Sequence, residues 1–199
     1  MKTKEILKLI FVNPFEKIAG WQALGLGLIV AILAALIGSY CGGIFNGALD
    51  YHTTGNPYPW WKALAMLAIS IASIIIMFLL AGIIFSKNFR VIDVVGTVTL
   101  AKAPFFFIAL TEFLSKPVIM NDIQAIINNP GVLYTSFTFW INLLLATLIA
   151  IWFIALLYNA FKVSLNIRKH RVMVFVIALI LAEVLSKVLI IITLYFETI

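Results

Sequence analysis

Charge and cysteine are scarce in this chain. Charged residues make up 11% of its 199 residues, and Cys41 is its single cysteine. A soluble globular domain carries about 25% charged residues, and one cysteine supports neither an intramolecular disulfide nor a cysteine-based metal site. The sequence also lacks a His-Glu-x-x-His pair, a paired-aspartate protease motif and a Gly-x-Ser-x-Gly elbow. These absences predict no metal, no cofactor and no enzymatic activity.

Hydrophobic residues, in contrast, make up 64% of the chain. A single soluble core cannot bury so much apolar surface, whereas a bilayer accommodates it because lipid-facing side chains need no polar cover. A spanning helix needs about 20 apolar residues, and five runs meet this length. We therefore predict an all-α integral membrane protein, with one five-helix membrane domain over residues 21–199. Its spans are expected at about residues 21–45, 62–85, 94–114, 139–161 and 172–196.

Lysine and arginine are unevenly distributed between these spans. Ten fall on the side of the N-terminus and two, Lys62 and Lys116, on the other, while Lys102 and Lys187 lie inside spans. Because basic residues concentrate on the cytoplasmic side, the N-terminus is predicted to be cytoplasmic and the C-terminus outside. The net charge of +6 then reflects topology and not nucleic-acid binding, and the lack of an Asn-x-Ser/Thr sequon suits a bacterial cytoplasmic membrane. The cytoplasmic basic anchor is expected at Lys162, Arg168, Lys169 and Arg171.

Segments outside the spans are expected at the membrane surface. In residues 1–20, lysines alternate with apolar side chains, which suits an amphipathic helix with its lysines toward anionic headgroups. Residues 123–127 are predicted to form a short surface helix. The outer loop 46–61 carries an aromatic belt typical of the headgroup region, formed by Tyr51, Tyr58, Trp60 and Trp61. Membrane lipids are therefore the first expected partner.

The first span carries small residues at four-residue spacing, which places them on one helical face. Such a face lets helix backbones approach closely and gain dispersion contacts. The simpler interpretation is a helix packed centrally in its own bundle. The alternatives are a contact with a second copy or a narrow pathway through the bundle. The face consists of Gly27, Ala31, Ala35, Ser39 and Gly43, beside Ala34, Gly38 and Gly42.

Ionisable residues inside the spans form a candidate charge centre. Lys102 and Glu183 lie roughly 12 and 16 Å from the inner face at 1.5 Å per residue, so an ion pair between the third and fifth spans is possible. Lys187 is a second candidate partner, four residues after Glu183 on the same helical face. A lone charge at mid-membrane costs roughly 3 kcal/mol. The pair either fastens the bundle or forms a proton- or substrate-binding centre.

Pro104 lies beside Lys102 in the third span. Proline has no N–H, so the carbonyl of Leu100 loses its usual helical donor and a kink is expected near Leu100–Pro104. Kinked helices mark binding sites in some transporters and are also a packing adaptation in membrane helices.

The order of several short segments resembles the Yip1 family of membrane proteins, in its bacterial form. The similarity lies in Asn13-Pro14-Phe15-Glu16-Lys17-Ile18, in Gly96 followed by Ala101-Lys102-Ala103-Pro104, and in Trp152 leading through Leu156 to Lys162 and the basic loop. The resemblance implies five helices, a cytoplasmic N-terminus and no known catalysis. Eukaryotic relatives act in vesicle traffic and contact Rab-type GTPases through a long N-terminal region. Such a region does not precede the first span here, so GTPase binding is not expected.

Two functions follow as hypotheses. The first is a non-enzymatic Yip1-like protein that acts through contacts with lipids, other membrane proteins or a second copy of itself. The alternative is a small-solute or ion transporter, or a channel, whose centre is Lys102, Glu183 and the Pro104 kink.

Overall fold

The computed structural model describes residues 12–54, 56–86, 88–115, 129, 131 and 137–195. The predicted interfacial helix before residue 12 and the predicted surface helix at residues 123–127 lie outside these ranges. Within the described ranges the chain is mainly helical, with two short strands.

Five helical segments are long and apolar enough to cross a membrane. The third segment is made of two helices in line, α4 and α5, and a short 3₁₀ helix, η1 (Pro14–Glu16), precedes the first. The last helix continues into a π-helical turn at Ile191–Tyr195. The helices are α2 (Gly20–Cys41), α3 (Trp60–Phe85), α4 (Val91–Ala101), α5 (Pro104–Ser115), α8 (Phe137–Leu165) and α9 (Arg171–Ile190).

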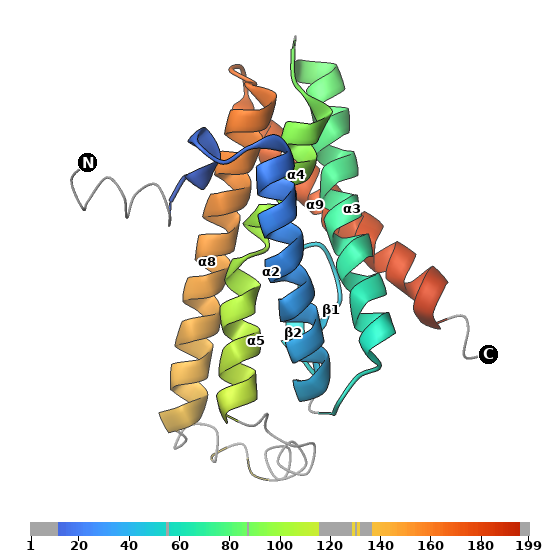
Figure 1. The fold of residues 1–199 in the computed structure, drawn as a ribbon, viewed down its shortest axis with the longest axis vertical. Coiled ribbons are helices and arrows are strands. Elements are labelled where there is room, and N and C mark those ends of the chain that lie inside the picture. Colours follow the sequence, from blue (N-terminus) through green and yellow to red (C-terminus); the bar gives the residue numbers. More distant parts are fainter. Residues whose placement is uncertain are drawn as a thin grey trace.

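Helix α2 lies against most of the other helices (Figure 1). It packs on α4, α5 and α3, while α8 covers α4 and α5 on one flank and α9 packs mainly on α3. The contact with α4 is close because Gly27 has no side chain: a Cβ there would lie 2.5 Å from the backbone nitrogen of Leu100. The predicted small-residue face therefore packs inside the bundle.

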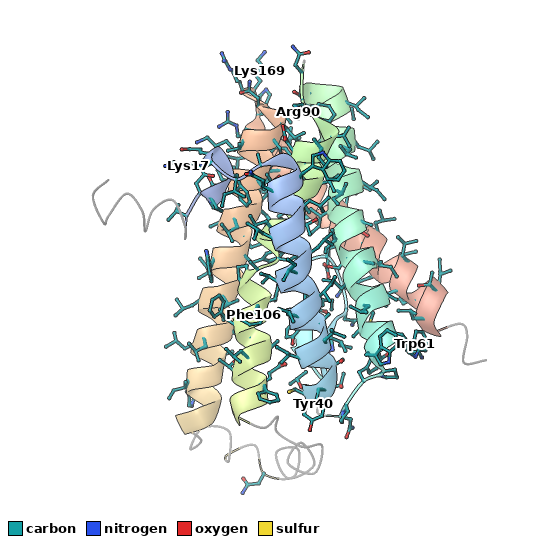
Figure 2. The ribbon with its side chains drawn as sticks, in the orientation of Figure 1. Lys17, Tyr40, Trp61, Arg90, Phe106 and Lys169 are labelled. Atoms are coloured by element: carbon teal, nitrogen blue, oxygen red, sulfur yellow. The ribbon has the colours of Figure 1, made fainter. Side chains whose placement is uncertain are left out.

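The two ends of the bundle differ in their side chains (Figure 2). Lys17, Arg90 and Lys169 lie at one end, which we call the basic end. Tyr40 and Trp61 lie toward the other, which we call the aromatic end. Exposed aliphatic side chains cover the flanks between them, above all on α8 and α9, as expected for surfaces that face lipid.

The first span is shorter than predicted, and the fold is not entirely helical. Helix α2 ends at Cys41 because Gly42 takes a left-handed conformation with φ 87°, which a residue without a Cβ adopts readily. The chain then forms an antiparallel hairpin, in which β1 (Gly43–Phe45) pairs with β2 (Tyr51–Thr53). We call residues 43–53 the hairpin, and residues 46–50 its tip.

The hairpin turns back into the bundle instead of lying along its surface (Figure 1). Phe45 and Ala48 are 1% and 0% exposed. The predicted aromatic belt is therefore wrong for Tyr51, whose ring packs on the buried rings of Phe45 and Phe105. Trp60 and Trp61 remain largely exposed near the aromatic end.

Candidate functional site

The third span breaks at Lys102 and Ala103, between α4 and α5. Pro104 supplies no N–H to Leu100, and the N–H of Ala103 donates to the Leu100 carbonyl instead, at 3.0 Å. The N–H of Phe105 donates to the Lys102 carbonyl at 3.1 Å. These tight turns satisfy the backbone groups that a proline would otherwise leave unpaired. The break in the helix therefore lies at Lys102, whose side chain is buried in the bundle.

Lys102 is enclosed by protein, with 1% of its surface exposed. Its side-chain nitrogen donates to the carbonyl of Ala48 at 2.6 Å and to Ser70 Oγ at 2.7 Å. It also lies 4.8–5.2 Å from the ring centres of Phe45, Phe105 and Phe153. Aromatic faces attract a cation at such distances. Because a bare charge in an apolar interior is costly, this shell of oxygens and rings is what allows a lysine here.

Helix α9 holds the next peptide groups of the hairpin tip. The N–H of Ala48 donates to Ser186 Oγ at 2.7 Å, and the N–H of Leu49 donates to Glu183 Oε2 at 2.7 Å. Ser186 Oγ in turn donates to the Glu183 carbonyl at 2.9 Å. A backbone N–H bound to a carboxylate is one of the stronger hydrogen bonds in proteins. Lys102 and Glu183 thus hold the two neighbouring residues at the tip.

A chain of charged side chains leads from the tip toward solvent. Glu183 Oε1 pairs with Lys187 Nζ at 3.2 Å, and Lys187 Nζ lies 3.5 Å from Asp50 Oδ2. Asp50 Oδ1 is 3.1 Å from His52 Nδ1. The exposed fractions of these side chains are 23% at Glu183, 47% at Lys187, 31% at Asp50 and 45% at His52. The charge centre is therefore buried at Lys102 and partly exposed at these four side chains.

A second polar contact fixes the start of β2. Tyr51 OH donates to Glu112 Oε2 at 2.9 Å. It also lies against α2, because a Cβ on Gly38 would be 2.6 Å from the same hydroxyl. Gly38 and Gly43 leave the room that the Tyr51–Glu112 pair occupies. This contact ties the hairpin to α5 as well as to α9.

The structure changes the interpretation of the predicted charge centre. Among the described residues, Glu183 pairs with Lys187 and not with Lys102, because the hairpin tip lies between the two and binds both. The Lys102–Glu183 ion pair that the sequence left open does not form in this structure. Both residues instead bind the backbone of the hairpin tip, Lys102 at Ala48 and Glu183 at Leu49.

The remaining predicted residues belong to two groups, the small-residue face of α2 and the basic anchor. The small-residue face has no exposed surface for a second copy, because all of its members are buried within the bundle. Of the basic anchor, Lys162, Arg168 and Lys169 are exposed and Arg171 is half-buried. The buried face is Gly27, Ala31, Ala35, Gly38, Ser39, Gly42 and Gly43. Within the described ranges, histidine, cysteine and carboxylate side chains form no group suited to a metal ion.

Four side chains of this site escaped sequence reasoning: Ser70, Ser186, Glu112 and Asp50. Serine is a weak signal in an apolar span, since its hydroxyl is often satisfied by its own helix. The run Gly42-Gly43 followed by Gly47-Ala48 was a stronger clue, because small residues permit close backbone approach. Hydropathy alone assigns these residues to the first span and to the outer loop.

No family model, curated protein or solved structure matches the chain. The Yip1 resemblance therefore stays a prediction.

Proposed function

We propose that the five helices cross a bacterial cytoplasmic membrane with the basic end in the cytoplasm and the C-terminus outside. The gathering of Lys17, Arg90 and Lys169 at one end supports this orientation (Figure 2), because basic residues favour the cytoplasmic face. A reporter enzyme that is active only in the cytoplasm should be inactive when fused to the C-terminus. An active C-terminal fusion would overturn the orientation.

Within that membrane, we propose a non-enzymatic, Yip1-like protein that acts through contacts with lipids or other membrane proteins. The supporting observation is that groups of the protein itself bind the buried lysine. Lys102 donates to the Ala48 carbonyl and to Ser70, and 1% of its surface is exposed. At the basic end, Arg168 and Lys169 are exposed on the connection between α8 and α9. Anionic headgroups are the chemistry that such an end recognises, at about 1 kcal/mol per basic residue.

Lipid bound to the purified protein tests this proposal. The double variant Arg168→Gln/Lys169→Gln should lose roughly half of the phosphatidylglycerol that co-purifies, because two of the attractive charges are gone. Lys62→Gln is the matched control, since Lys62 lies beside Trp61 near the other end, with its nitrogen 5.3 Å from that ring centre. Mass spectrometry of extracted lipid gives the readout. Equal phosphatidylglycerol in both variants would contradict a lipid contact at the basic end.

A transporter or channel is the second candidate, and one observation favours it. The side chains of Glu183, Lys187, Asp50 and His52 form a row of charged and polar contacts that leads from the hairpin tip to side chains nearly half exposed. Proteoliposomes with an internal pH-sensitive dye would then show a proton flux that Glu183→Gln abolishes. Such a flux would replace the contact proposal with a transport function.

A further inference from the structure

The hairpin tip is non-helical backbone placed between the helices of a membrane bundle. Its own pairing is limited: the N–H of Asn46 donates to the Asp50 carbonyl at 3.1 Å and closes the turn. Backbone of this kind is tolerated at membrane depth only where protein or water satisfies its polar groups. The Ala48 N–H and carbonyl and the Leu49 N–H are bound by side chains from two other segments, the third span and α9, so groups outside the hairpin hold the tip in place.

Two contacts act on neighbouring residues of the tip. Lys102, at the break between α4 and α5, binds the carbonyl of Ala48. Glu183, on α9, binds the N–H of Leu49. We call these contacts the lysine latch and the glutamate latch. Both act on backbone atoms, so neither contact requires a polar side chain at position 48 or 49.

The tip is shaped to enter this space. A Cβ on Gly47 would lie 2.5 Å from Glu183 Oε1, and Ala48 is 0% exposed. A side chain at position 47 would therefore meet the Glu183 carboxylate and hold the tip away from it. Farther along the hairpin, His52 and Thr53 are exposed. The hairpin therefore has a small, polar-bonded tip inside and an exposed base.

The glutamate latch is also shared. Glu183 Oε2 binds the hairpin, while Glu183 Oε1 pairs with the half-exposed Lys187. Lys187 also reaches Asp50, the last residue of the tip. The glutamate thus joins the buried contact to charged groups that solvent reaches.

From these contacts we propose that the hairpin is a removable plug in the bundle, retained by the lysine and glutamate latches. Its withdrawal uncovers a polar pocket that contains Lys102, Ser70 and Glu183 and opens on the side where His52 and Thr53 are exposed. The inference goes beyond the lipid contact at the basic end, and either can fail without the other.

Cysteine labelling tests the plug. In a Cys41→Ala background, Ala48→Cys should react at least about tenfold more slowly with a soluble maleimide than Thr53→Cys, since position 48 is buried and position 53 exposed. Adding Glu183→Met removes the acceptor of the Leu49 N–H and should raise the Ala48→Cys rate about tenfold. Glu183→Gln is the matched variant. It keeps an oxygen acceptor for the Leu49 N–H, so the labelling rate of Ala48→Cys should stay close to the rate measured with Glu183 in place.

Ala160→Cys reports whether the bundle stays folded, because Ala160 is 0% exposed on α8. It should stay unreactive in every variant. If Ala48→Cys remains unreactive beside Glu183→Met while Ala160→Cys is protected, the plug is overturned. If Glu183→Met makes Ala160→Cys reactive, Ser186→Ala decides instead, since it removes the acceptor of the Ala48 N–H and, besides that, a local hydrogen bond within α9 to the Glu183 carbonyl. An unchanged Ala48→Cys rate there overturns the proposal, and an increase of several-fold with Ala160→Cys protected supports it.

Discussion

The third and fifth spans both carry charged side chains within apolar helices, but the surroundings of those side chains differ. Lys102 in the third span is 1% exposed and surrounded by a carbonyl, a hydroxyl and three aromatic rings. Lys187 in the fifth span has 47% of its side chain exposed and pairs with carboxylates at 3.2 and 3.5 Å. One lysine is held by groups of the bundle interior, whereas the other lies at its edge.

The difference indicates which of the two lysines affects the stability of the fold more. Burying a charge is tolerated only when hydrogen bonds and packing replace its water. The surroundings of Lys102 come from α3, α5, α8 and the hairpin, so they form only when the bundle is complete. A half-exposed ion pair keeps much of its hydration and contributes little. The comparison therefore predicts that stability is concentrated around the third span.

The largest effect is expected from Phe105→Ala, beside Lys102. The Phe105 ring is 4% exposed and lies 4.7 Å from Phe153 and 5.4 Å from Phe45, centre to centre. Truncation leaves a cavity and should lower the free energy of unfolding by about 3–5 kcal/mol. Ile180→Ala on α9, at a side chain 58% exposed, should cost far less because lipid or detergent fills the space. Denaturant unfolding in micelles measures both, and equal losses would remove the contrast between the spans.

A smaller effect is expected when each lysine is replaced by methionine. Lys102→Met leaves the Ala48 carbonyl without its donor and should destabilise the protein by about 1–3 kcal/mol, with relief of charge burial acting in the opposite direction. Lys187→Met should cost less than about 1 kcal/mol, because its ion pairs are half-exposed. Thermal unfolding of the two variants side by side gives the comparison. A more stable Lys102→Met protein would mean that this lysine is present for function at the expense of stability.

Much of the architecture was predictable because it depends on local composition. The five spans follow from apolar length, and the structure has five helices that meet that requirement. Pro104 marked the position of the break in the third span, since a missing N–H is a property of the residue itself. The four-residue spacing of small side chains likewise indicated which face of α2 packs closely.

The hairpin was not predictable from the same signals. Residues 46–50 have the composition of an ordinary connection, and their entry into the bundle depends on partners far away in the sequence: Lys102, Ser186 and Glu183. Helical spacing placed Glu183 correctly beside Lys187, because four residues make one turn. It could not place Glu183 relative to Lys102, since the packing of α9 and the position of the hairpin decide that distance.

The sequence by itself therefore determined that this protein has five apolar helices, a basic end, a break at Pro104 and ionisable groups within two spans. These are properties of single residues and of helical periodicity. Only the tertiary structure decided that Lys102 faces the hairpin, that Glu183 holds the next residue of that hairpin, and that the small-residue face is buried. The physical reason is that a buried polar group accepts whichever partner packing brings within hydrogen-bond reach, and packing depends on the whole bundle at once.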